Sequence, residues 1–235
     1  MADDPGLDNP VYAALMGAQS RFARVCGQAV RYQADVAPFL ALAPDPSEGA
    51  WVDAVQLVAP GTYVAVQRPR VQAPGNWQVV REFEVLQMVE DHVERVDDPE
   101  ALALGPADVP EMLGLVRETD PGPFLERTIE LGRYIGIRHR GHLVAMAGER
   151  IHLEGWREIS AVCTASAHRG HGLASRLVRA VACGIHHRHE RAFLNVVATN
   201  TDAVALYERL GFRIRVTRNL SVMTPTTGPP DEGHA

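Results

Sequence analysis

The stretch Arg169-Gly-His-Gly-Leu-Ala174 joins an apolar segment, residues 158–164, to a helical pattern that starts at Leu173. A helix N-terminus leaves its first N–H groups unpaired and carries partial positive charge, so a glycine turn before it can present these donors to a phosphate. The stretch lacks the third glycine of a dinucleotide fingerprint and the Gly-Lys-Ser/Thr of a nucleotide P-loop. Alone, such a turn is more often only a connection, so a second signal is needed.

That signal is Asn200-Thr-Asp-Ala-Val-Ala-Leu-Tyr-Glu-Arg-Leu-Gly-Phe212. It predicts a helix over residues 201–210, with Asn200 or Thr201 as the N-cap and Gly211 just past the C-terminus. One face of this helix carries Ala203, Leu206, Tyr207 and Leu210. Tyr207 therefore points inward, either as a core aromatic residue or as a proton donor.

Composition narrows the class of protein. The chain has 235 residues, of which 46% are hydrophobic, so it can build a core without metal or disulfide support. The three cysteines stand at no metal-ligand spacing, which is typical of free thiols in a reducing cytoplasm. The sequence shows neither a basic or hydrophobic leader nor an apolar run of about 20 residues. We therefore expect a cytoplasmic protein that does not enter a membrane. The net charge of −6 argues against a general nucleic-acid binder.

Residues 168–191 carry a local positive bias, which fits either a solvated helix face or a site for a small polyanionic ligand. Four neighbouring basic residues, 186–189, lie at a helix end, where histidines more often complement the helix dipole than bind metal. No metal site is predicted. Cys163 has no neighbouring histidine and orienting acid, so a nucleophilic role is not favoured for it.

The charged run at residues 90–99 divides the chain. Before it, apolar spacing predicts helix within residues 10–43, and short apolar runs predict strands at 55–58, 63–66, 79–80 and 83–88. After it, the pattern predicts strands at 101–104, 134–138, 143–153, 158–164, 193–198 and 212–223. Helices are predicted from 108, over 124–131, over 173–187 and over 201–210. The fold class is thus α/β, an α+β arrangement with a mixed sheet.

The two motifs occur in a fixed order along the chain. A strand leads into the Arg-x-x-Gly-x-Ala turn and a helix, and a second strand leads to Asn200 and the helix with Leu-Tyr-x-x-Leu-Gly-Phe. This order resembles the GNAT superfamily of N-acetyltransferases. Both motifs are complete, and the resemblance runs from about Ala101 to Met223. It implies that an N-terminal α+β domain over residues 1–95 precedes a GNAT domain over residues 96–223. The N-terminal domain is either a degenerate GNAT-like half or a lid over the acceptor site. Residues 224–235 show no periodicity and are expected to form a flexible tail.

The resemblance also implies where acetyl-CoA, the acyl donor, would bind. The pantetheine arm would lie between two diverging strands, and the pyrophosphate would lie on the turn. Asn200 would bond the pantetheine or hold the strands apart. The implied cofactor-binding residues are Val162, Cys163, Thr164, Arg169, Gly170, His171, Gly172, Leu173, Ala174, Ser175, Asn200 and Ala203.

Two residues are implied in catalysis. Tyr207 would give a proton to the departing CoA thiolate, since a phenol is neutral and able to donate near pH 7. Glu158 would take the proton of the attacking amine, directly or through water; the alternative is a structural glutamate paired with an arginine such as Arg157. A backbone N–H of Val162 or Cys163 would stabilise the oxyanion.

The sequence therefore predicts an N-acetyltransferase that moves an acetyl group from acetyl-CoA to a primary amine by direct attack. The amine could belong to a small molecule, an amino acid, a peptide or a protein lysine, and residues 121–124 are the expected acceptor-side loop. Two other classes stay open: a non-catalytic acyl-CoA sensor or interaction module, and an enzyme that binds ATP through the same turn. The expected assembly is a monomer or homodimer.

Overall fold

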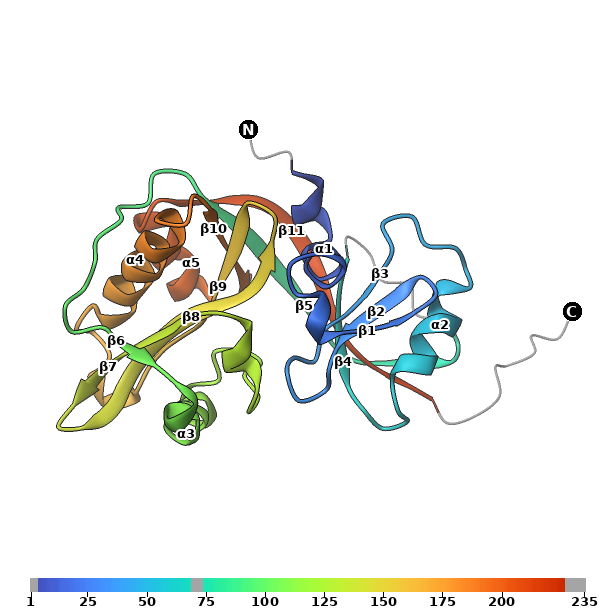
Figure 1. The fold of residues 1–235 in the computed structure, drawn as a ribbon, viewed down its shortest axis with the longest axis horizontal. Helices are drawn as coiled ribbons and strands as arrows, with labels where there is room; N and C mark the ends of the chain where they lie inside the picture. The colour runs from blue at the N-terminus through green and yellow to red at the C-terminus, as the bar shows by residue number, and fades with distance from the viewer. Residues whose placement is uncertain (1–3, 69–73, 227–235) are drawn as a thin grey trace, which may run out of the picture.

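The computed structural model describes residues 4–68 and 74–226, and an eight-stranded mixed sheet dominates it. The strand order is β4-β11-β5-β10-β9-β8-β7-β6 (Figure 1). β9 and β10 are parallel, and the other neighbours are antiparallel. The strands are β4 (Val64–Arg68), β5 (Trp77–Glu90), β6 (Leu102–Leu104), β7 (Tyr134–His139), β8 (His142–Leu153), β9 (Trp156–Thr164), β10 (Arg191–Val197) and β11 (Phe212–Pro225). The predicted α/β class with a mixed sheet is confirmed.

The elements predicted after residue 100 are mostly confirmed. α3 (Val109–Thr119), α4 (Leu173–His186) and α5 (Thr201–Arg209) lie where the periodicity places them, and β7 and β8 form the expected antiparallel hairpin. The helix predicted over residues 124–131 is wrong, because only a 3₁₀ turn forms there, Thr128–Leu131. The hydroxyl of Thr128 accepts from the Leu125 amide and donates to the Val36 carbonyl, which fixes the segment as a turn against the first half.

The first half differs more from its prediction. α-Helix forms only in α1 (Pro10–Met16), and a 3₁₀ turn follows at Ser20–Phe22. The residues after the turn supply a small sheet of β1 (Ala23–Cys26), β2 (Ala29–Tyr32) and β3 (Leu40–Leu42). The strand predicted over residues 55–58 is wrong, since it ends helix α2 (Ala50–Leu57). A short apolar run fits one face of a helix as well as a strand. The runs at 79–80 and 83–88 are parts of one strand, β5.

Two layers cover the large sheet. α4 and α5 share a hydrophobic core with the sheet residues Ala145, Ala147 and Ile159. On the opposite face, α3 packs with Met146 and Cys163, and the first half packs with Ile151 and Phe193. This second face, called the front face below, therefore brings the N-terminal segments to the start of β9 and β10.

The sheet extends across the charged run at residues 90–99. β5, which precedes the run, lies between β10 and β11 and pairs with both, and β4 pairs with β11 (Figure 1). The division into domains at residue 95 stays a prediction. Of the expected tail, residues 224 and 225 end β11, while residues 227–235 lie outside the described residues.

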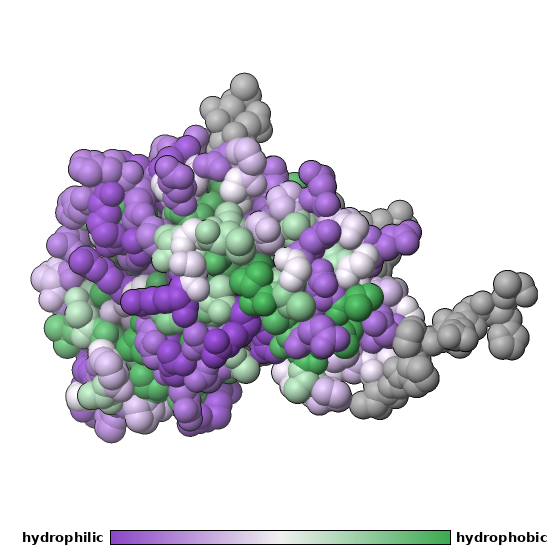
Figure 2. All heavy atoms as spheres, turned by 45° about the vertical axis from the view of Figure 1, so that its right-hand side comes forward, coloured by the Kyte–Doolittle hydropathy of each residue, from purple (hydrophilic) through white to green (hydrophobic). Residues whose placement is uncertain are grey.

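The face of the molecule drawn in Figure 2 is mainly polar. Figure 2 shows hydrophilic side chains over most of one face, with hydrophobic side chains gathered near its middle. None of the helices in the described ranges combines the length and apolar character needed to cross a bilayer.

Candidate active site between two diverging strands

The candidate site begins where β9 and β10 separate. Their parallel pairing includes Ala192 with Arg157 and ends with Phe193 opposite Glu158. Beyond that pair, no further residues of these two strands, which lie wholly within the described residues, pair with each other. β9 nevertheless continues to Thr164 and β10 to Val197. The backbone of β9 after Glu158 is therefore free on the side facing β10, where an extended ligand could pair with it.

A β-bulge distorts β9 inside this gap. Met146 pairs with Cys163 and Gly148 with Ser160, so Ala161 and Val162 together lie opposite the single residue between them on β8. Ala161 takes φ of 52°, a left-handed conformation that costs a residue with a side chain roughly 1–2 kcal/mol. Bulges of this kind redirect backbone groups beside active sites. An alanine in an apolar strand gives no sequence signal of this conformation.

The glycine turn forms an open cradle before α4, and residues 169–174 are called the glycine cradle below. Gly170 and Gly172 have φ of 80° and 73°, and a Cβ at either position would point into open space. The ring Nδ1 of His171 lies 2.9 Å from the Arg169 carbonyl oxygen. Leu173, Ala174 and Ser175 form the first turn of α4, where N–H groups have no intrahelical acceptor. The predicted phosphate-binding residues are thus adjacent at one end of the gap.

Asn200 and Ala203 lie at the start of α5. The Asn200 side-chain oxygen accepts from the Ala203 amide at 3.2 Å, so Asn200 is the N-cap, one of the two residues predicted for it. Gly211 follows the helix with φ of 92°, and a Cβ there would come within 2.7 Å of the His92 backbone. Glycine is therefore required where α5 meets β11.

Tyr207 projects from α5 into the hydrophobic core between the helices and the sheet, where Ile159 of β9 and Val196 of β10 also lie. Its ring packs edge-on against Phe212 at 6.1 Å. Burial, with a smaller contribution from the Cys163 thiol, raises the pKa of Tyr207 to about 12. Burial likewise raises the pKa of Cys163 to about 11, which keeps it a thiol and a poor nucleophile near neutral pH.

Glu158 lies at the other end of the gap, where its carboxylate is 1% exposed. The Arg150 guanidinium donates to both carboxylate oxygens, Nε to Oε2 at 2.8 Å and Nη2 to Oε1 at 2.9 Å. Asn195 on β10 also donates to Oε1, at 2.9 Å. The alternative of a glutamate paired with an arginine is therefore confirmed, but the partner is Arg150. Arg157, the example named from the sequence, pairs instead with Glu149 and Glu190.

Arg150 and Asn195 were missed by the sequence reasoning. A second irregularity places two residues of β8, Arg150 and its neighbour, opposite Glu158, because Glu149 pairs with Ile159 and His152 with Arg157. The signal available for Arg150 was its charge inside the apolar run 143–153, since arginine is seldom buried without a partner. Burial lowers the pKa of Arg150, but the adjacent Glu158 carboxylate outweighs it and leaves the pKa above its usual value.

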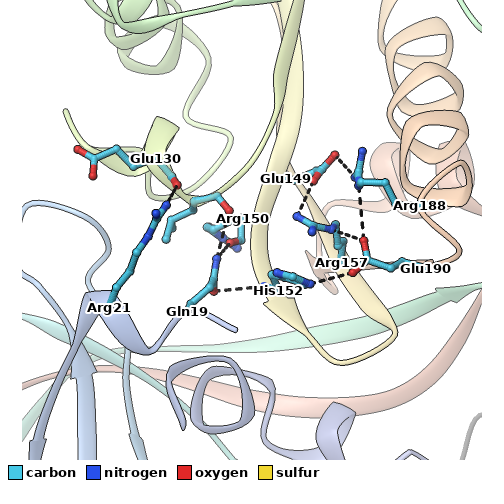
Figure 3. Close-up of polar contacts among 10 residues, drawn as sticks. Gln19, Arg21, Glu130, Glu149, Arg150, His152, Arg157, Arg188 and Glu190 are labelled. Atoms are coloured by element: carbon cyan, nitrogen blue, oxygen red, sulfur yellow. Dashed lines mark hydrogen bonds and ion pairs between the residues drawn. The ribbon is translucent and has the colours of Figure 1, made fainter. Parts of the chain in front are cut away.

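The first half holds Arg150 in place. Its guanidinium lies 4.7 Å from the Phe39 ring centre, and its backbone carbonyl accepts from Gln19 at 2.8 Å. Figure 3 shows Gln19 extending from the first half to Arg150 and to the backbone of His152. Beside them, a mainly buried ion-pair network joins β8 and β9 to the end of α4; it consists of Glu149, Arg157, Arg188 and Glu190 (Figure 3). Residues from both halves therefore fix the front face of the site.

The positive bias of residues 168–191 is partly neutralised within the chain. Arg176 pairs with Asp98 and Glu100, and Arg179 pairs with Glu94. These acidic residues come from the charged run and the residue after it, which lie against α4. The basic side chains of α4 are thus neither simply solvated nor all available to a ligand.

Comparisons with known proteins identify the family of the chain. The sequence profile of the FR47-like protein family matches residues 134–221. Mycothiol acetyltransferase of Corynebacterium glutamicum is 45% identical over 62 residues, which are 25% of this chain and only 20% of that enzyme. The chain thus spans about a fifth of the length of that curated relative.

Solved structures extend the match to the whole chain. A GCN5-related N-acetyltransferase from Kribbella flavida shares the fold, with a TM-score of 0.63 at 18% identity over 93% of this chain and 95% of that one. A GNAT-family protein from Novosphingobium aromaticivorans is 38% identical with a TM-score of 0.88, and the match covers 96% of this chain and 100% of that one. This chain therefore belongs to the GNAT superfamily of acetyltransferases.

Proposed function

We propose that this protein transfers the acetyl group of acetyl-CoA to a primary amine by direct attack of the amine nitrogen on the thioester carbonyl. The observation that carries the proposal is the gap between β9 and β10, which has the glycine cradle at one end and Tyr207 beside it. The gap offers unpaired strand backbone to the pantetheine arm and helix N–H groups to the pyrophosphate.

The donor would lie along β9. In this proposal Val162, Cys163 and Thr164 bond the pantetheine through their backbone, and residues 169–175 bind the pyrophosphate. In the same proposal Asn200 and Ala203, at the start of α5, would line the other side of the gap. The open space beside Gly170 and Gly172 supports this fit, because a phosphate could approach both backbones closely.

The reaction has a simple balance of atoms. The new C–N bond forms as the C–S bond breaks, and the departing thiolate takes a proton from the Tyr207 hydroxyl. With its pKa raised to about 12, Tyr207 stays protonated at neutral and mildly alkaline pH, where an alkylamine is already partly deprotonated. The N–H of Val162 or Cys163, next to the bulge at Ala161, would stabilise the developing oxyanion.

Glu158 is proposed as the group that takes the amine proton. Both of its oxygens already accept hydrogen bonds from Arg150, and Oε1 accepts another from Asn195. A carboxylate oxygen has two lone pairs, so Oε2 keeps one for the amine or for a bridging water. Glu158→Gln retains an oxygen for Arg150 but removes the base. It is expected to lower kcat by a factor of about 10² or more while leaving the KM for acetyl-CoA unchanged.

The test measures binding and turnover separately. Acetyl-CoA or CoA at 100 times its Kd should raise the stability by about 2.7 kcal/mol, while ATP with Mg²⁺ should not. Release of CoA thiol is then followed with a panel of primary amines, for the wild type and for Tyr207→Phe. Stabilisation by ATP alone would contradict the proposal. Binding of acetyl-CoA without turnover of any amine would favour a non-catalytic acyl-CoA sensor.

A further inference from the structure

Two buried tyrosines flank the ion pair of Arg150 and Glu158, and they differ in whether the hydroxyl has a hydrogen-bond partner. Tyr32 comes from the first half, and its hydroxyl donates to the Gln19 side-chain oxygen at 2.6 Å. Tyr134 comes from β7, is 2% exposed, and its hydroxyl has no hydrogen-bond partner among residues 4–68 and 74–226. The fold therefore satisfies one of two similar hydroxyls and leaves the other unpaired.

Packing fixes the direction of the Tyr134 side chain. Tyr134 pairs with Gly148 on β8, and its ring lies over that glycine so closely that a Cβ there would meet ring carbons. The Phe124 ring contacts it edge-on at 5.3 Å. The ring thus crosses β8 toward β9, where it shares a hydrophobic cluster with Ala161 and Cys163. The hydroxyl cannot swing away to another partner.

The charges next to Tyr134 are those of the candidate site. Burial raises the pKa of Tyr134, while Arg150 lowers it and Glu158 raises it to smaller extents. The strand register agrees: Tyr134 lies opposite Gly148, and Gly148 lies opposite Ser160, which is two residues along β9 from Glu158. A buried hydroxyl without a partner costs stability, and phenylalanine would fill the same space without that cost.

We propose that the Tyr134 hydroxyl hydrogen-bonds the amine acceptor, and that it selects acceptors with a carbonyl oxygen next to the primary amine, as in an α-amino amide. This inference rests on the proposed function. Glu158 would attract the amine, while the positive charge of Arg150 favours an electron-rich ligand atom beside Tyr134. A hydroxyl in that position donates, so a carbonyl oxygen fits it and a hydrocarbon leaves it unpaired.

The experiment compares two probes of similar shape, L-alaninamide and sec-butylamine, with acetyl-CoA as donor. The wild type should acetylate L-alaninamide. Tyr134→Phe should lower kcat/KM for L-alaninamide roughly tenfold or more and change kcat/KM for sec-butylamine less than about twofold. The KM for acetyl-CoA should stay the same, and the melting temperature should not fall. Because the ratio of the two probes is compared between enzymes, the different basicities of the amines cancel.

Tyr32→Phe is the matched control. It removes a hydroxyl that the fold already satisfies, so it should lower the melting temperature and leave the ratio of the two probes unchanged. Three results would overturn the inference: equal loss on both probes in Tyr134→Phe, a melting temperature lowered as much as in Tyr32→Phe, or no turnover of L-alaninamide by the wild type. If acetyl-CoA also fails to bind, the proposed function fails with it. If sec-butylamine alone is acetylated, only the inference fails.

Discussion

The glycine cradle and the surroundings of Arg150 lie toward opposite ends of β9, and they are built in different ways. The cradle is one continuous stretch, exposed, with left-handed glycines beside open space. Arg150 is buried and is held by Glu158 on β9, by Pro123 before β7 and by Phe39 in the first half. One end depends on local backbone geometry, and the other depends on side chains distant in sequence. Changes at the two ends should therefore separate ligand binding from stability.

Arg150→Met should have the largest effect, at the buried end. It leaves the Glu158 carboxylate buried without its charged partner, which typically costs about 3–5 kcal/mol. Urea unfolding measures the loss. The matched control is Arg127→Met, which breaks exposed ion pairs with Glu130 and Asp35 and should move the urea midpoint much less. Equal effects of the two substitutions would remove the contrast between the buried and the exposed ion pair.

Tyr207→Phe should act on the chemical step alone. Loss of a general acid typically lowers kcat by a factor of about 10² or more. Because the ring and its contact with Phe212 remain, the affinity for CoA should change less than about twofold, which isothermal titration can measure. A variant with full kcat would exclude Tyr207 as the proton donor.

Gly172→Val should act on donor binding at the exposed end. A side chain with φ near 73° costs about 1–2 kcal/mol, and it would also occupy the space proposed for the pyrophosphate. The affinity for CoA should fall at least about tenfold. Gly155→Val is the control, because Gly155 has φ of 72° and open space around it but lies in the β8–β9 turn. If both variants lose the same affinity, strain and not the cradle explains the loss.

The smallest expected effect is a dependence of stability on alkaline pH. The folded-state pKa of Tyr207, about 12, exceeds the usual value near 10, so its contribution is complete below pH 10 and is lost as pH rises through 12. At pH 11 the wild type should have lost about 1.4 kcal/mol through this residue. Tyr207→Phe should lack that part of the decline between pH 8 and pH 11, as measured by urea unfolding. If the stability of the two proteins declines in parallel over this pH range, the pKa of Tyr207 is not raised by folding.

The contrast between local backbone geometry and contacts between distant side chains also explains which features the sequence could predict. The cap at Asn200, the glycine at 211 and the inward face carrying Tyr207 follow from local chemistry and spacing, and the structure places them as expected. Glu158 was recognisable as a candidate, but its partner Arg150 was not. Two bulges between β8 and β9 change which residues face each other, and neither contains a glycine or proline that would reveal it in the sequence.

The first half was harder to predict for a related reason. Its short apolar runs fit helix and strand equally, and packing against the rest of the chain decided between them, as at residues 55–58. The part played by Gln19 and Phe39 beside Arg150 depends on contacts across more than a hundred residues. No motif carries such information.

The position of β5 between β10 and β11 has a consequence for synthesis on the ribosome. Residues 64–90 supply two strands of the large sheet, but their partners are translated only with residues 191–225. The interval is about 100 residues, or roughly 5–20 s at ordinary elongation rates. Throughout it, the nascent chain exposes strand edges that can pair with other chains. A nascent chain of this protein thus depends on protection from aggregation until its last strands emerge.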